Sequence, residues 1–464
     1  MYQNSFTTEF TEDTQRAPSK AIKRLYGSER SHLLDGCQNF EASNQNITLR
    51  LLCFLIFLCG ESTGAVFTNL QFLPFPGLTL LDGGHGFRLH SAHRGRRPRE
   101  GIVAIDYQAR LDRLLEQSGA DLAAFVPGEN MVYFTGLHFH LSERPILGLY
   151  SRDGLSFIIP ELEVPKLEAR PELEARRFAW TDQAGYEDAF ADAVGALLPG
   201  GATCALDGQT LRFFEWRALE KAGLPAASAL DVGDLFLNLR ARKAPEEIAK
   251  MQRAVDISEA ALGATMDWAR PGMTERQIAD RLGAEMLERG SHGHAFLIAL
   301  TGEKTGQPHG NMGDRVWGEN EFLLIDFGAT YQDYPADITR TFCYGEPTAQ
   351  MRAMYDAVYS ANLAAREFAR PGVTCAAVDQ VARAVIEAAG LGEYFIHRLG
   401  HGLGLSVHEL PNIVAGNEQL LQPGMVFTIE PGVYIPGVGG VRIEDNVVVT
   451  ADGIKVLTSY PREL

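Results

Sequence analysis

Residues 325–342 read IDFGATYQDYPADITRTF and contain two aspartates, Asp326 and Asp337, in settings typical of buried strands. Asp326 follows the apolar run FLLI, Asp337 precedes Ile338, and turn-forming residues lie between the two runs. The pattern therefore predicts a hairpin. A buried carboxylate is costly unless a cation or hydrogen-bond donors meet it. We interpret this hairpin as half of a metal site.

Three histidines follow in the segment HRLGHGLGLSVHE, residues 397–409: His397, His401 and His408. A single histidine beside glycines is more often structural than a metal ligand, but three within twelve residues favour a site. Glycines on both sides of His401 would let the backbone approach a ligand or ion closely.

Two glutamates stand in later strand-like runs. Glu430 ends an apolar run before a Pro-Gly pair, and Glu444 lies two residues after Arg442, on the same face of a strand. One strand carboxylate usually pairs with a cation, but four would need several buried cations, and these segments supply chiefly Arg340 and Arg442. Two divalent ions would balance four carboxylates with His401 neutral. Oxygen-rich ligation favours Mn²⁺ or a similarly hard ion, and two such ions can share one water and lower its pKa.

Length and charge set the broad class of the protein. The 464 residues exceed one hydrophobic core, so at least two domains are expected. Residues 1–100 carry 11 Lys+Arg against 9 Asp+Glu, whereas the remainder carries 31 against 50, which argues against a nucleic-acid-binding main body. Six scattered cysteines without a CxxC pair predict a reducing cytoplasm, and the nine-residue apolar run at 51–59 is too short to span a membrane.

Residues 1–102 show no sustained amphipathic pattern and are expected to have little ordered structure. Two interpretations compete. One is a genuine extension or cryptic targeting segment, and the other is a start codon assigned too early, with translation beginning near Ile102 or Val103. We favour the second interpretation, which N-terminal sequencing or the intact mass of the native protein would test.

Regular patterns begin after this segment and predict an α/β domain over residues 103–240. A turn at Ser151–Gly154 predicts a hairpin. The predicted helices are 107–117, 186–198 and 211–221, and the predicted strands are 122–126, 147–150, 155–159 and 203–206.

Residues 241–464 contain a repeat. ARPGMT at 269–274 recurs as ARPGVT at 369–374, and each copy precedes an amphipathic helix that stops at a glycine, Gly290 or Gly390. Pro-Gly and an N-terminal Thr are common around helix ends, but five identities in six positions favour duplication. We predict two similar halves related by a pseudo-twofold axis.

These residues resemble the pita-bread metallopeptidases, which include Xaa-Pro dipeptidase (prolidase), Xaa-Pro aminopeptidase and methionine aminopeptidase. The resemblance is carried by the five candidate ligands in their GHG, VHE, IEPG and RIED contexts, and it covers about residues 105–464. The upstream domain resembles the creatinase type, which points to the proline-specific members. The implied fold is α/β (α+β), with a creatinase-type N-terminal α/β domain followed by a pseudo-twofold pita-bread catalytic domain.

The resemblance implies a role for each candidate ligand. Asp326 would chelate one metal, Asp337 and Glu444 would bridge both, and His401 and Glu430 would bind the other. The cofactors would be two divalent ions, with Mn²⁺ favoured and Co²⁺ or Zn²⁺ as alternatives.

The resemblance also assigns roles around the ligands. Glu430 would accept the proton of the attacking water, His309 would contact the scissile peptide region, and His408 would stabilise the oxyanion. Tyr434 and Arg442 would support the site, and His397 would form a wall of the proline pocket.

The implied activity is cleavage before proline in small peptides with proline at the second position. A dipeptidase is favoured by the compact core and the ending LTSYPREL, and an aminopeptidase acting on longer peptides is the alternative. A noncatalytic binding module of the same fold, or a creatinase-like hydrolase without metal, is disfavoured because all five ligands are present. A homodimer is implied, without nucleic-acid or membrane partners.

Overall fold

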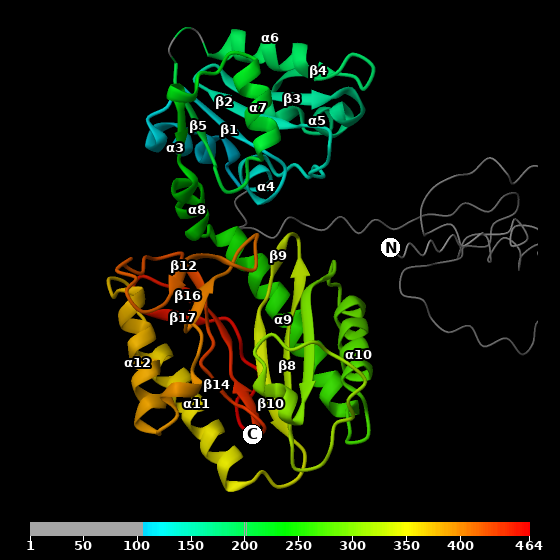
Figure 1. The fold of residues 1–464 in the computed structure, drawn as a ribbon, viewed down its shortest axis with the longest axis vertical. Coiled ribbons are helices and arrows are strands. Elements are labelled where there is room, and N and C mark those ends of the chain that lie inside the picture. The colour runs from blue at the N-terminus through cyan, green and yellow to red at the C-terminus, as the bar shows by residue number, and fades with distance from the viewer. Residues whose placement is uncertain (1–104, 199, 201) are drawn as a thin grey trace, which may run out of the picture. The chain divides into compact units, whose positions relative to one another are not determined.

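The computed structural model describes residues 105–198, 200 and 202–464 (Figure 1). The expectation for residues 1–102 lies outside these residues. No described helix combines the length and the apolar character that crossing a bilayer requires.

The first part of the described chain is a six-stranded sheet in the order β4-β3-β2-β1-β5-β6. Its strands are β1 (Leu122–Phe125), β2 (Leu147–Ser151), β3 (Gly154–Pro160), β4 (Arg176–Trp180), β5 (Cys204–Leu206) and β6 (Ala229–Asp231). Its helices are α3 (Tyr107–Ser118), α4 (Glu129–Thr135), α5 (Val164–Glu168), α6 (Glu187–Leu197), α7 (Phe213–Lys221) and α8 (Gly233–Ala241). Both faces of the sheet are covered: in β1, Ala123 and Phe125 enter one core, while Leu122 and Ala124 enter another.

The predicted helices and strands of this part are confirmed, with ends that shift by one or two residues. The predicted hairpin is β2 paired with β3, closed where Ser151 lies opposite Gly154. Strand β4 is not evident in the sequence, because it lies at the sheet edge and only Phe178 and Trp180 of its five residues are buried.

The second part begins with α9 (Pro245–Trp268) and α10 (Glu275–Glu288), which pack against a sheet in the order β10-β8-β7, with β9 paired to β8. Its strands are β7 (His294–Thr301), β8 (Phe322–Tyr331), β9 (Tyr334–Pro335) and β10 (Ile338–Cys343). The predicted hairpin is confirmed, because β8 and β10 pair antiparallel with Asp326 opposite Thr339.

The remaining chain repeats this plan with α11 (Ala349–Phe368) and α12 (Cys375–Ala388) (Figure 1). Its five-stranded sheet has the order β12-β11-β13-β16-β17, and β14 pairs with β15. The strands are β11 (Gly400–Gly402), β12 (Glu409–Ile413), β13 (Val426–Ile429), β14 (Gly432–Ile435), β15 (Gly439–Arg442), β16 (Asp445–Val449) and β17 (Ile454–Val456).

The sequence repeat corresponds to a structural repeat. Thr274 and Thr374 each cap the following helix with the side-chain oxygen, which accepts an amide hydrogen bond from the third helical residue. Gly272 and Gly372 both adopt left-handed backbone angles, with φ of 97° and 82°, which only glycine adopts without strain. The same turn therefore joins the two long helices of each half.

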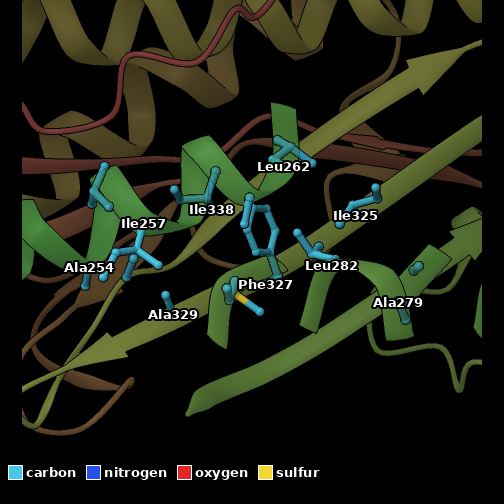
Figure 2. Close-up of a cluster of buried hydrophobic side chains, with 14 of the residues drawn as sticks. Ala254, Ile257, Leu262, Ala279, Leu282, Ile325, Phe327, Ala329 and Ile338 are labelled. Carbon is cyan, nitrogen blue, oxygen red and sulfur yellow. The ribbon is translucent and has the colours of Figure 1, made fainter. Parts of the chain in front are cut away.

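Strand β8 separates the hydrophobic core from the candidate site. Figure 2 shows Ile325, Phe327 and Ala329 in one cluster with side chains of α9 and α10. Those helical side chains include Ala254, Ile257, Leu262, Ala279 and Leu282. Because strand side chains alternate, Asp326 lies on the opposite face from this cluster. Burial of Phe327 alone contributes about 1.5–3 kcal/mol to folding, so the core holds Asp326 in place.

Candidate metal centre

The structure brings the five predicted ligands together from both halves of the second part. Asp326 lies within β8 and Asp337 directly precedes β10. His401 is the central residue of β11, Glu430 directly follows β13, and Glu444 directly precedes β16.

The closest group consists of Asp337, His401 and Glu444, whose potential ligand atoms all lie within 4.8 Å of one another. All three residues are buried. His401 Nε2 lies 3.5 Å from Asp337 Oδ2 and 3.3 Å from Glu430 Oε1. Asp326 is close enough for its charge to act on Asp337 and Glu444, and its Oδ2 accepts from Arg442 Nη2.

Positive charge is scarce around these carboxylates. Among the described side chains, Arg442 is the only lysine or arginine that forms an ion pair with any of the four. Asp326 Oδ1 is buried and has no hydrogen-bond partner among the residues that the structure describes. Arg340, the other cation that these segments supply, pairs with Asp445 instead. The carboxylates therefore lack the charge that would balance them.

Burial and mutual repulsion disturb the ionisation of the group. Burial raises the pKa of Asp337 and of Glu444 well above the ordinary range, and neighbouring carboxylates raise both further. Burial also raises the pKa of Glu430 to about 7, although Arg442 partly opposes this shift. Burial lowers the pKa of His401 to about 3, so its imidazole is neutral and free to bind a metal. Four carboxylates with one neutral imidazole are a donor set that fits two divalent ions.

Two threonines hold the ligands in place. Thr339 Oγ1 donates to Glu444 Oε2 at 2.7 Å and accepts from Arg442 Nε at 3.0 Å. Thr428 Oγ1 donates to Glu430 Oε1 at 3.2 Å and accepts from the amide of His401 at 3.1 Å. Both threonines are fully buried. They limit the side-chain rotation of two predicted ligands, Glu444 and Glu430.

The chain around this centre matches two families. Residues 108–242 match the creatinase/prolidase N-terminal domain, and residues 249–451 match metallopeptidase family M24. An Xaa-Pro dipeptidase of Lactobacillus helveticus is 37% identical over 358 residues, which cover 76% of this chain and 97% of that protein. The chain belongs to metallopeptidase family M24.

Two solved structures are similar to this M24 chain over nearly their whole length. The Xaa-Pro dipeptidase from Bacillus anthracis is 30% identical with a TM-score of 0.71, and the match covers 77% of this chain and 99% of that one. The X-Pro aminopeptidase from Thermotoga maritima is 33% identical with a TM-score of 0.67, and the match covers 76% and 99%. The predicted family, fold class and enzymatic nature are confirmed: the chain is a metallopeptidase similar to Xaa-Pro dipeptidases, with a creatinase-type domain before a pita-bread domain.

A chain of hydrogen bonds runs beside the M24 metal centre through Arg442, Tyr434 and His397. His397 Nδ1 lies 2.7 Å from the carbonyl oxygen of Arg398, which can only accept, so Nδ1 carries the proton. Burial lowers the pKa of His397 to about 4, so the ring is neutral and its Nε2 accepts from the Tyr434 hydroxyl at 2.9 Å. Tyr434 in turn accepts from Arg442 Nη1 at 2.8 Å. Each hydrogen bond in this series therefore has a defined donor and acceptor.

The other two predicted histidines lie at the exposed edge of the M24 centre. The His408 ring is 4.3 Å from the His401 ring, centre to centre. Partial burial, with a smaller effect of the Arg398 charge, lowers the pKa of His408. His309 is exposed. Electrostatic coupling to His309 is one of the smaller causes that lower the pKa of His397 and of His408, which places His309 near both rings.

Glu409 supports the segment that carries His408. Its buried carboxylate accepts from the Ser406 amide at 3.1 Å and from Lys243 Nζ at 3.0 Å, and it also pairs with Arg240. These bonds fix the backbone next to His408.

The glycines around His401 lie very close to the backbone of neighbouring strands. A Cβ at Gly400 would lie 1.9 Å from the Thr428 carbonyl oxygen, and one at Gly402 would lie 2.0 Å from that of Leu410. Among the described residues, the close approach that these glycines permit is to neighbouring backbone. Glycine is required here because β11 packs tightly between two segments of its sheet.

Thr339 and Thr428 were not predicted as site residues, although the sequence contains a signal for them. Each stands two residues from a ligand, Asp337 or Glu430, and the period of two places it on the same face. A threonine at that spacing is a candidate to hold a neighbouring ligand in this M24 site.

Proposed function

We propose that this chain hydrolyses the peptide bond before proline in Xaa-Pro dipeptides, with two divalent ions held by the five predicted ligands. The proposal is carried by the buried group of Asp337, His401 and Glu444, whose ligand atoms lie within 4.8 Å of one another. Glu430 and Asp326 adjoin this group. Similarity to proteins described as Xaa-Pro dipeptidases supports the choice of substrate.

Within this proposal, Asp326 binds one ion, His401 and Glu430 bind the other, and Asp337 and Glu444 contribute to both. The ions supply Lewis acidity toward the peptide carbonyl and make a water acidic enough to react near neutral pH. We favour Mn²⁺ because the donor set is rich in oxygen and contains no thiolate, with Co²⁺ or Zn²⁺ as alternatives. Metal analysis of the protein purified from its native source distinguishes them.

Glu430 is proposed to take the proton of the attacking water and to pass it to the departing proline nitrogen. Its carboxylate is held by Thr428 and lies next to His401, so it is oriented before substrate arrives. His408 is proposed to donate a hydrogen bond to the developing oxyanion, since it stands beside His401 at the exposed edge of the centre.

The proposed preference for proline has a physical basis. The peptide nitrogen of proline carries no hydrogen, so the site needs no acceptor for it but must accommodate the ring. His397 is proposed as one wall of that pocket. The His397 imidazole is uncharged near neutral pH, and hydrogen bonds at both ring nitrogens set its orientation. It can therefore form a rigid, uncharged surface against the apolar proline ring. His309 is proposed to contact the scissile region from the exposed side.

The decisive experiment compares substrates. Mn²⁺-loaded protein is incubated with an Xaa-Pro dipeptide, the matching Xaa-Pro-Yaa tripeptide and an Xaa-Ala dipeptide as control. A higher kcat/KM for the Xaa-Pro dipeptide is expected. Preference for the tripeptide would establish the aminopeptidase alternative, which the similarity to the Thermotoga maritima protein favours. Protein with two bound metals that cleaves neither proline peptide would refute both.

Three further properties belong to the proposal. We propose a homodimer, which light scattering on the purified protein tests. We propose a reducing cytoplasm, supported by the free thiols of Cys204, Cys343 and Cys375. We propose residues 103–240 and 241–464 as separate domains, supported by largely separate hydrophobic clusters on either side of this boundary.

A further inference from the structure

Asp445 directly follows the proposed ligand Glu444 but takes no part in the proposed reaction. Its side chain is fully buried. Arg462 binds it through a two-bond fork, with Nε 2.7 Å from Oδ2 and Nη2 2.7 Å from Oδ1. Arg340 Nη2 donates to Oδ1 at 2.9 Å, and Thr458 Oγ1 donates to the same oxygen at 2.8 Å. Both oxygens of this carboxylate are therefore used.

Arg340 ties this carboxylate to the backbone of the metal centre. Its guanidinium has five N–H donors, and five acceptors lie within hydrogen-bond distance. The acceptors are the carbonyl oxygens of Thr339, Glu444, Tyr460 and Pro461 and the Asp445 carboxylate. The bond to Glu444 O is 2.6 Å long. Arg340 is buried, so these bonds are protected from water.

The peptide of Glu444 is held on both sides. Its carbonyl accepts from Arg340, and its amide donates to Thr339 O at 3.1 Å. The next residue is held by Arg462. Arg340 therefore bonds to the Glu444 peptide itself, and Arg462 bonds to the side chain of the next residue.

The last residues are themselves anchored to helices of both halves. Tyr460 N donates to Glu259 Oε1 of α9 at 2.7 Å, and Ser459 Oγ donates to Glu259 Oε2 at 2.6 Å. The Tyr355 hydroxyl of α11 donates to the Arg462 carbonyl at 2.7 Å. This segment lies beyond residue 451, where the M24 family match ends.

We propose that Thr458–Arg462, together with Arg340 and Asp445, form a C-terminal clasp that positions Glu444 for metal binding. Its members are positioning residues, because none of them is a proposed metal ligand. The inference rests on the proposed function in one respect, the assignment of Glu444 as a ligand. Loss of a group that orients a metal ligand typically weakens metal affinity 10- to 100-fold.

The test uses the full chain with Arg462→Gln, which removes the charge and the fork, and Arg462→Lys, which keeps the charge but loses the fork. Lys455→Gln is the matched control, because it removes an exposed positive charge from the neighbouring strand β17. The Kd for Mn²⁺ is measured by competition with a chelator. The Tm of each variant is measured with and without Mn²⁺.

Arg462→Gln is expected to raise the Kd for Mn²⁺ about 10-fold or more. The Kd of Arg462→Lys is expected to lie between those of Arg462→Gln and wild type. The Kd of Lys455→Gln is expected to equal that of wild type. The gain in Tm on adding Mn²⁺ is expected to shrink in Arg462→Gln. If Arg462→Gln lowers the Tm equally with and without Mn²⁺ and leaves the Kd at its wild-type value, the role of Arg462 is purely structural. That result would overturn the proposal that the clasp positions Glu444. If Arg462→Gln does not fold, a wild-type Kd for Arg462→Lys overturns it. Failure of the wild-type protein to bind Mn²⁺ would instead refute the proposed metal site.

Discussion

Thr339→Val removes one hydroxyl from behind the metal centre and almost nothing else. The two side chains have nearly the same shape, and Thr339 is fully buried, so no cavity or exposed surface is created. The hydroxyl gives Glu444 Oε2 a 2.7 Å hydrogen bond and Arg442 Nε a 3.0 Å acceptor. Valine can replace neither bond.

The size of the expected effect on Mn²⁺ affinity follows from the charges of Glu444 and Arg442, the two hydrogen-bond partners of Thr339. A hydrogen bond to a charged group contributes about 1.5–3 kcal/mol. If the substitution destabilises the metal-bound form by about 1.4 kcal/mol more than the metal-free form, the affinity for Mn²⁺ falls about 10-fold. We therefore expect the Kd for Mn²⁺ to rise about 10- to 100-fold, the range found when groups behind metal ligands are removed.

The assay is competition for Mn²⁺ between the protein and a chelator, with Tm recorded in parallel. Thr341→Val is the matched control. Thr341 lies on the same strand, is equally buried and bonds to the backbone of Arg442, but it contacts no predicted ligand. It should lose stability with less than about a threefold change in Kd. Thr339→Ser keeps the hydroxyl and should restore most of the affinity.

The reasoning would be refuted by a wild-type Kd in Thr339→Val, or by equal losses of affinity in Thr339→Val and Thr341→Val. The first result would mean that Glu444 needs no fixed orientation. The second would mean that any polar loss in β10 disturbs the centre.

Three other outcomes are expected. Glu430→Ala and His408→Ala should each lower kcat on an Xaa-Pro dipeptide at least ~100-fold with metal present, and undiminished turnover in either would remove that residue from the mechanism. Asp337→Asn should weaken binding of both ions, and a calorimetric titration that shows one tight site with full activity would contradict its shared role. In metal-free protein the pKa of Glu430 is raised to about 7, and the pKa values of Asp337 and Glu444 are raised well above their ordinary values. The protonated carboxyls therefore stabilise the fold fully below about pH 4, and the contribution of Glu430 is lost as the pH rises through about 7. The gain in Tm on adding Mn²⁺ should therefore be larger at about pH 7.5 than at about pH 5, and equal gains would contradict the shifts.

Much of the fold could be predicted because its signals are local. The capped helices after Thr274 and Thr374, and the hairpin around Gly154, follow from neighbouring residues alone. The edge strand β4 shows the limit, because only two of its residues face a core. The backbone segments that lie against Gly400 and Gly402 could not be inferred either, since a glycine in a strand shows that something lies close but not what it is.

The sequence by itself determined that four carboxylates stand in or directly beside apolar strands, and so that a cation is required, because burial follows from the local pattern of apolar residues. The period of two did not place Glu444 correctly: it was predicted on one strand face with Arg442, but β15 ends at Arg442 and Glu444 lies between β15 and β16. Only the tertiary structure decided which cation meets which carboxylate. Arg442 bonds Asp326 at a separation of 116 residues, and Arg340 bonds Asp445 at a separation of 105. The sequence shows that both arginines stand near the predicted ligands, but not which carboxylate each one meets. That pairing depends on strand register and on the position of the C-terminal segment, which local sequence patterns do not predict.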